Sequence, residues 1–217
     1  SMTASKPSSR RRRARIGGGV MMKSGSCGRK TLRGCGSKVS TIEGAAGGGL
    51  SPWAVIGSPA AGGEIGFTAH ASRAVTQDYA LSATGVAVGI HDRVELSLAR
   101  QDFTTGVTGV GLGLPGLHLK QDIVGAKWRI AGDAVLDSDS LMPQIAVGVQ
   151  HKTLHRSGLD GTLDALGARR SGTDVYVSAT KLFLAQGILV NGTLRATKAN
   201  QNGLLGFGAT LGGADNS

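Results

Sequence analysis

The stretch that decides the fold runs Val124-Gly125-Ala126-Lys127-Trp128-Arg129-Ile130. Its apolar side chains alternate strictly with glycine or with charged side chains. A period of two places successive side chains on opposite faces of a β-strand, whereas an amphipathic helix would repeat about every 3.6 residues. One face of this strand is therefore apolar, and the other carries Lys127 and Arg129.

The same alternation extends in both directions along the chain. Most of the alternating segments are about ten residues long, which suits a strand that crosses a membrane (about 9–11 residues) better than a strand of a soluble sandwich (about 5–6). The phase slips near Thr84-Gly85, which predicts a β-bulge there. The predicted strands are 64–74, 79–90, 94–103, 117–131, 144–150, 173–181 and 188–198.

The connections between these segments alternate between short and long. His91-Asp92-Arg93 and Ala185-Gln186-Gly187 are short, whereas 104–116 and 153–172 are long. Tight turns on one side and long loops on the other are typical of an outer-membrane barrel. The sequence thus predicts an all-β fold: an antiparallel, up-and-down transmembrane β-barrel, incomplete, with about eight strands present. A soluble β-sandwich is the alternative, since its strands alternate as well.

The basic charge of the chain is concentrated at one end. Residues 1–40 hold eleven basic residues and no acidic ones, whereas the remainder is nearly neutral. Ile16–Met22 is too short and too rich in glycine for the apolar part of a secretory signal. We therefore expect a basic, Gly/Ser-rich disordered arm or defective signal region over 1–40, and a partial β-barrel domain over 41–217.

The sequence contains no motif that indicates catalysis. Neither G-x-S-x-G nor H-E-x-x-H occurs, and no Cys or His spacing suits zinc. The glycine-rich stretch 109–116 is expected to be a flexible loop rather than a phosphate cradle, because no helix pattern follows it. We predict no enzyme activity, no catalytic residue, no cofactor and no metal. The histidines, expected to be solvated or interfacial, are His70, His91, His118, His151 and His155.

Polar side chains on the alternating segments are expected to face the barrel lumen. Interior charges of mixed sign either set the field for a passing solute or pair with one another and fill the barrel. If a pore exists, Lys127, Arg129 and Arg195 would favour anions. The predicted lumen-facing residues are Glu95, Gln101, Lys127, Arg129, Gln150, Lys152, Asp174, Asn191 and Arg195.

Several segments resemble one family of proteobacterial outer-membrane proteins without assigned activity, domain of unknown function three-zero-three-four. The resemblance implies an outer-membrane β-barrel but no substrate or reaction. Members of that family are expected to begin with a secretory signal and to continue for several more strands, so we expect this chain to be truncated at its C-terminus and atypical at its N-terminus. The similar segments are 42–54, 91–101, 121–127, 132–135, 143–150, 179–182 and 191–201.

Two functions from different classes remain open. The first is an outer-membrane protein of a Gram-negative bacterium, with porin-like passive transport or a structural role. Its partners would be outer-membrane lipid, the barrel-assembly machinery and small solutes, with no nucleic acid expected. The second is a soluble β-rich module whose basic arm binds nucleic acid or another polyanion through clustered Arg and Lys.

Overall fold

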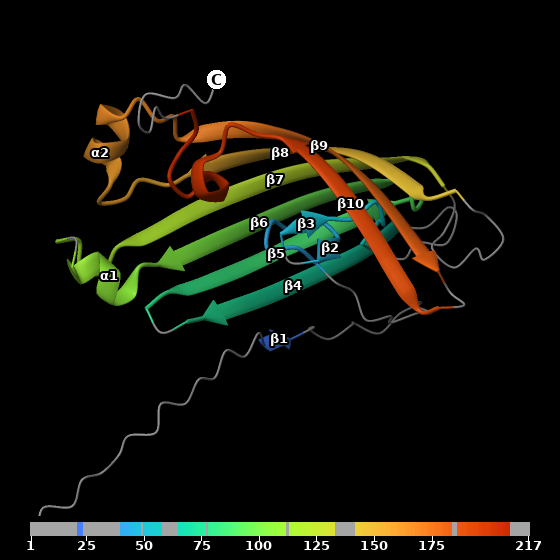
Figure 1. Cartoon of the computed structure of the whole chain (residues 1–217), viewed down its shortest axis with the longest axis horizontal. Helices are drawn as coiled ribbons and strands as arrows, with labels where there is room; N and C mark the ends of the chain where they lie inside the picture. Colours follow the sequence, from blue (N-terminus) through green and yellow to red (C-terminus); the bar gives the residue numbers. More distant parts are fainter. Residues whose placement is uncertain are drawn as a thin grey trace, which may run out of the picture.

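The computed structural model describes residues 21–23, 40–48, 50–57, 65–76, 78–111, 113–132, 142–183 and 186–208. An antiparallel sheet curls into a half-barrel, and each strand from β4 onward pairs with the next strand along the chain (Figure 1). The predicted all-β, up-and-down architecture is confirmed. The strands of this sheet are β1 (Met21–Lys23), β4 (Ile65–Val75), β5 (Ala80–Ile90), β6 (Val94–Thr104), β7 (His118–Ala131), β8 (Gln144–Leu154), β9 (Ser171–Phe183) and β10 (Ile188–Ala196).

The arm predicted over 1–40 lies mostly outside the described residues. Within it, β1 pairs antiparallel with β4, where Met22 lies opposite Ser72. The seven long strands run from β4 to β10, and β1 adds a short eighth strand at the edge of the sheet.

The two ends of the half-barrel differ only in part as the connections predicted, because the short connection between β4 and β5 lies at the same end as the two longest connections. At one end, the turn end, His91-Asp92-Arg93 joins β5 to β6, and both His91 and Asp92 have positive φ angles of 51° and 53°. At the other, the loop end, the long connections fold into α1 (Gly106–Gly111) and α2 (Asp160–Ala165) (Figure 1). The sequence predicts a flexible loop over 109–116, but the first residues of this stretch, up to Gly111, belong to α1. None of the helices among the described residues is long and apolar enough to cross a membrane.

The predicted bulge near Thr84-Gly85 is wrong. Strand β5 keeps an unbroken register with both neighbours, and a register shift occurs instead between Arg129 and Ala131, where β7 pairs with β8. The apparent phase slip arose because the inward residues of β5 near this point are Ala83 and Gly85. Such small side chains carry little hydrophobic contrast, so the phase of the alternation cannot be read from them.

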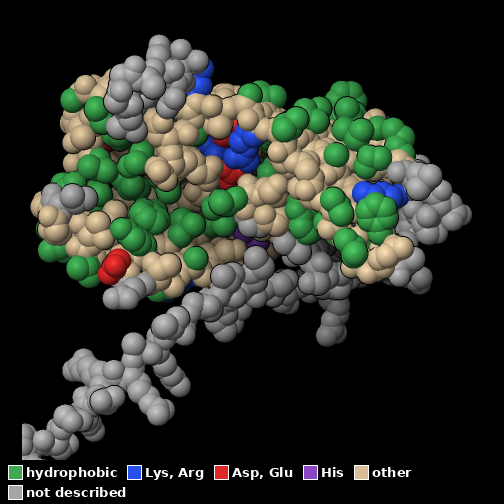
Figure 2. Space-filling view, viewed as in Figure 1, with side chains coloured by type: hydrophobic (Ala, Val, Ile, Leu, Met, Phe, Trp, Pro, Cys, Tyr) green, Lys and Arg blue, Asp and Glu red, His purple; other side chains and the backbone are tan. Residues whose placement is uncertain are grey.

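The outer and inner faces of the sheet have the reverse of the polarity found in a water-soluble protein. Outward side chains such as Leu98 and Trp128 are 54% and 57% exposed. Inward side chains such as Glu95 and Lys152 are at most 1% exposed. Figure 2 shows hydrophobic side chains spread over the surface, with acidic and basic side chains gathered together near the middle of the view.

Two further segments occupy the hollow of the half-barrel. The inner segment, residues 40–48 and 50–57, contains β2 (Gly47–Gly48) and β3 (Ser51–Pro52) and lies between β10 and the opposite strands (Figure 1). The return segment, residues 197–208, turns back from the end of β10 through the short helix η1 (Asn200–Gly203). The interior is therefore filled by the chain itself.

Candidate functional site

The candidate site is the set of charged side chains that hold the inner segment against the sheet. It has two parts, the Glu95 cluster (Glu95 with Lys127) and the Glu43 cluster (Glu43, Lys152, Asp174 and Arg195). The sheet provides every member except Glu43, which belongs to the inner segment.

The Glu95 cluster fixes the inner segment by its backbone. Glu95 on β6 lies directly opposite Lys127 on β7, and its Oε1 is 3.0 Å from Lys127 Nζ. The same carboxylate accepts hydrogen bonds from the N–H groups of Ala46 (3.0 Å) and Gly57 (2.6 Å). Lys127 Nζ donates to the carbonyl oxygen of Val55 at 2.7 Å. Each buried charge thus has several partners, which offsets part of the cost of removing it from water.

Close approach of the inner segment to the sheet depends on glycine. A Cβ added to Gly57 would lie 2.8 Å from Ala46 Cβ and 3.1 Å from Glu95 Oε2. Gly44, whose φ is +95°, packs so closely on β6 that an added Cβ would lie 2.9 Å from Ala99 Cβ. The glycine-rich composition of this segment therefore follows from its position inside the half-barrel.

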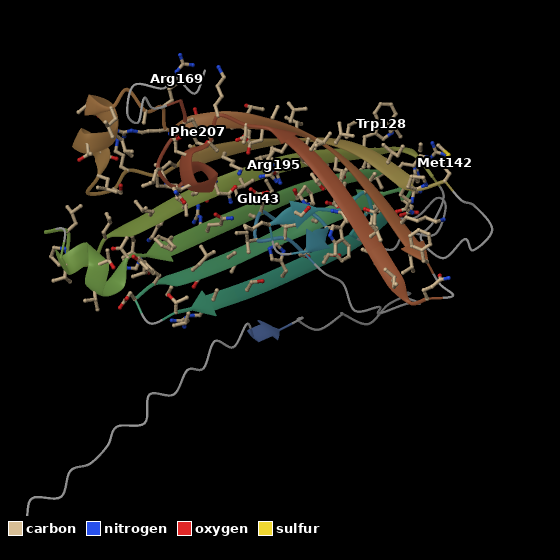
Figure 3. The ribbon with its side chains drawn as sticks, in the orientation of Figure 1. Glu43, Trp128, Met142, Arg169, Arg195 and Phe207 are labelled. Carbon is tan, nitrogen blue, oxygen red and sulfur yellow. The ribbon has the colours of Figure 1, made fainter. Side chains whose placement is uncertain are left out.

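The Glu43 cluster joins the inner segment to three strands. Glu43 Oε1 is 2.6 Å from Lys152 Nζ on β8, and both oxygens of Glu43 accept from Arg195 on β10, at 2.9 and 2.5 Å. Lys152 Nζ is also 3.0 Å from Asp174 Oδ2 on β9. Figure 3 shows Glu43 and Arg195 pointing toward one another in the middle of the molecule. Two carboxylates and two cations therefore form one connected, buried network.

The protonation of Glu43 follows from these contacts. Burial by itself would raise the pKa of Glu43, because it disfavours the charged form. The hydrogen bond from Arg195, with the positive charges of Lys152 and Arg195, outweighs burial and leaves the pKa below its ordinary value. Glu43 is therefore a carboxylate at neutral pH.

The return segment closes the network at the loop end. Lys152 Nζ donates to Asn202 Oδ1 at 2.8 Å, and Gln121 donates to the Asn202 carbonyl oxygen. The ring of Phe207 lies over Gly172, where an added Cβ would be 2.2 Å from the ring. Figure 3 shows Phe207 between Arg169 and the Glu43 cluster. The return segment thus covers the charged network from this end.

The remaining predicted lumen-facing residues also lie on the inner face. Gln101 donates to the carbonyl oxygen of Ile42 at 3.0 Å, and Asn191 donates to Ser51 Oγ at 3.2 Å. Gln150 is fully buried. Arg129 pairs with Asp92 of the turn end at 2.9 Å, and the pKa of Asp92 is raised by burial, against the opposing effect of Arg129. The structure thus brings the nine predicted residues to one face of the sheet, where most of them contact the inner segment.

This arrangement does not favour the predicted attraction of anions by Lys127, Arg129 and Arg195. Each of these cations is paired, with Glu95, Asp92 and Glu43 respectively. The sequence predicts that interior charges either set the field for a passing solute or pair with one another and fill the barrel. In the structure they pair with one another inside the half-barrel. Within the described ranges, no group of His, Cys, Asp and Glu is arranged to hold a metal ion.

Sequence reasoning missed Glu43 as a member of the site. A signal was available, because the predicted lumen holds four cations but only two carboxylates, Glu95 and Asp174. Glu43 is also the first acidic residue of the chain, in a stretch otherwise formed of small and apolar residues. Asn202 carried no such signal, since only the reversal of the chain after β10 brings it to Lys152.

The histidines fall into two groups. Four are exposed or sit on the outer surface, where His118 contacts Asp102 and His155 contacts Asp122, at 2.9 and 2.8 Å. His70 differs, because its ring faces inward against Gly85 and, among the described residues, its two nitrogens have no hydrogen-bond partner. The prediction that His70 is solvated or interfacial is therefore wrong, because both of its ring nitrogens are buried inside the half-barrel.

Comparison with known proteins gives one match. A family model described as "Protein of unknown function (DUF3034)" matches residues 36–216, which include the inner segment, all seven long strands and the return segment. No curated protein and no solved structure matches the chain.

Proposed function

Because the chain belongs to the family described as Protein of unknown function (DUF3034), whose description assigns no activity, we propose its function from the geometry. We propose that the chain is a β-barrel-type protein of the Gram-negative outer membrane. Its role is either structural or passive transport, and transport takes place only when the inner segment moves aside. The observation that carries the proposal is the reversed polarity of the sheet, apolar outside and charged inside.

The outer face supports this proposal in extent as well as in composition. Strands of 9 to 14 residues meet the length of about 9–11 residues that a tilted strand needs to cross a bilayer. Exposed apolar side chains occur on every long strand except β5, among them Phe67, Leu98, Val124, Val177 and Leu194. A soluble protein rarely exposes so extensive an apolar surface, since water solvates it poorly.

Exposed aromatic side chains occur at both ends of the half-barrel: Tyr79 lies at the loop end, stacked on Phe103, and three others lie toward the turn end. Phe67, Trp128 and Phe183 are all exposed there, and each pairs with a residue at or near the end of the neighbouring strand. Aromatic side chains prefer the interface between hydrocarbon and water, where barrels carry a girdle of them. Because barrels have short turns on the periplasmic side, we propose that the turn end, with its tight turn at His91-Asp92-Arg93, lies at the periplasmic interface.

The edge of β10 sets a condition on this proposal. Among the described strands, β10 pairs only with β9. Unpaired backbone groups cost several kcal/mol each in hydrocarbon, so a membrane-embedded form needs a further strand against β10.

The two tryptophans of the chain provide a test. Trp128 lies on the outer face, whereas Trp53 lies in the inner segment, where its carbonyl oxygen accepts from Lys127. After refolding into vesicles with brominated acyl chains, the tryptophan fluorescence of the Trp53→Phe variant should be strongly quenched, because this variant retains Trp128. Trp128→Phe should be quenched little.

Equal, weak quenching of both variants would contradict the membrane proposal. The soluble alternative predicts that result, together with a detergent-free protein that binds DNA in a salt-sensitive way. That alternative depends on residues 1–40, which lie mostly outside the described residues.

A further inference from the structure

A pocket of about 380 Å³ opens at the loop end, where the connection after α1 meets the chain that follows β8. One wall is apolar and contains Leu114 and Leu117, whose side chains would lie 3.8 and 3.6 Å from a Cβ added to Gly158. The other wall is basic and contains His118, Lys120 and Arg156. The pocket thus combines a hydrophobic side with a cationic side.

The pocket lies at the border of the apolar outer face. His118 and Lys120 point outward from β7, on the same side of the strand as Val124 and Trp128. Lys120 precedes Val124 by four residues, which is about 13 Å along a strand. If the apolar face contacts hydrocarbon, this pocket lies at the level of the lipid headgroups.

The charges around the pocket are unbalanced. Asp102 is the nearest carboxylate, with its two oxygens 2.9 Å from His118 Nδ1 and 3.9 Å from Lys120 Nζ. Among the described residues, no carboxylate pairs with Arg156. The adjacent Asp122 is engaged by Arg100 and His155 at 2.6 and 2.8 Å. Asp102 thus offsets part of the charge of Lys120, whereas Arg156 has no carboxylate partner among the described residues, so the two cations together retain net positive charge.

We propose that this pocket binds the phosphate group of an anionic membrane lipid. Lys120 and Arg156 donate to the phosphate oxygens, because cationic donors form strong, short hydrogen bonds to phosphate. The Leu114 and Leu117 wall packs against the carbons next to the headgroup. Basic pockets near the membrane surface recognise lipid headgroups in this way. The inference rests on the proposed membrane location and adds the class of ligand and its site.

The test compares two double variants that lose the same charge. Lys120→Gln/Arg156→Gln removes both pocket cations, whereas Arg73→Gln/Arg169→Gln removes two exposed cations that do not line the pocket. All four side chains are exposed, so both variants should fold. Each protein is refolded into nanodiscs of phosphatidylcholine with a minor share of phosphatidylglycerol, and the retained lipid is counted by mass spectrometry.

We expect the pocket variant to bind phosphatidylglycerol at least tenfold more weakly, and the control variant to stay within about twofold of the wild type. Equal losses in the two variants would overturn the site, because they would indicate attraction by net charge alone. Displacement of the lipid by an equal concentration of inorganic phosphate would also overturn it, since the pocket would then bind phosphate without regard to lipid.

Failure of this inference can be separated from failure of the proposed function. Quenching of Trp128 by brominated lipid is measured on the same nanodiscs. A quenched Trp128 with unchanged lipid retention in the pocket variant rejects only the pocket, whereas an unquenched Trp128 rejects the membrane location on which the pocket depends.

Discussion

Glu43 and Arg195 lie 152 residues apart in the chain and form a two-point ion pair, in which Nη1 and Nη2 of Arg195 are 2.9 and 2.5 Å from the two carboxylate oxygens of Glu43. The pair joins the inner segment to the last strand of the sheet. It also continues through Lys152 to Asp174, so that the last three strands and the inner segment share one network. This contact makes the inner segment part of the fold rather than a loose plug.

The first prediction concerns the loss of Glu43. Glu43→Gln leaves Lys152 and Arg195 with too little negative charge in a buried position, and we expect the free energy of unfolding to fall by about 3–5 kcal/mol. Urea titration of the refolded protein measures the change. Asp122→Asn is the matched control, because it removes a carboxylate from an exposed pair. A loss no greater than that of the control would mean that Glu43 does not anchor the segment.

The second prediction is a dependence of stability on pH. The pKa of Glu43 is lower in the folded protein than in the unfolded chain, so its contribution is fully present above about pH 4.3, the ordinary glutamate value. That contribution is lost as the pH falls through the lower, folded value. Thermal unfolding followed from neutral to acid pH should therefore show a loss of stability below pH 4.3 that is smaller in Glu43→Gln. Parallel curves for the two proteins would contradict the assignment.

The third prediction tests the outer face. Leu98→Arg places a charge in the middle of the apolar surface, where a lipid environment would make it cost about 2–4 kcal/mol. Thr153→Arg, on the outward side of β8 near the loop end, should cost about 0–1 kcal/mol. Urea unfolding from vesicles gives both values. If Leu98→Arg leaves the free energy of unfolding unchanged, the outer face is exposed to water instead.

The fourth prediction concerns the packing of Tyr176 on Gly148. A Cβ at Gly148 would lie 2.2 Å from Tyr176 Cζ, so the ring must move if alanine is introduced. Tyr176 is buried, with Arg195 5.9 Å from its ring centre, and has little room to shift. We expect Gly148→Ala to destabilise the protein by about 1–3 kcal/mol.

Gly192→Ala is the control for this substitution. Gly192 lies in β10 with no atom within 4 Å of an added Cβ, and its replacement should change stability by less than about 0.5 kcal/mol. Similar effects of the two substitutions would show that strand propensity, rather than the Tyr176 contact, decides the result.

The fifth prediction concerns passage of solutes. The filled interior predicts no steady conductance for the wild type in planar bilayers. Glu43→Gln/Glu95→Gln weakens both anchors of the inner segment and should give intermittent openings if transport occurs through the interior. Steady conductance of the wild type would mean that the inner segment does not close the path.

The alternation of side chains was sufficient to predict the strands, their order and the face on which the charges lie. Each long strand begins and ends within a few residues of its predicted bounds, because a period of two is a local property that the backbone of an extended strand imposes. The tight turn at His91-Asp92-Arg93 could be predicted because only these three residues separate two alternating segments. Where the local pattern was weak, as at Ala83 and Gly85, the prediction of a bulge was wrong.

The position of the inner segment was decided only by the tertiary structure. Nothing in the local sequence around Glu43 shows that it faces Lys152 and Arg195, since their contact depends on the curl of the whole sheet. The same is true of Asn202, which reaches Lys152 only because the chain reverses after β10. Sequence periodicity thus determined the polarity of each face. The partners of the buried charges were determined by long-range packing, because a buried ion needs an opposite charge nearby in space, whatever its distance along the chain.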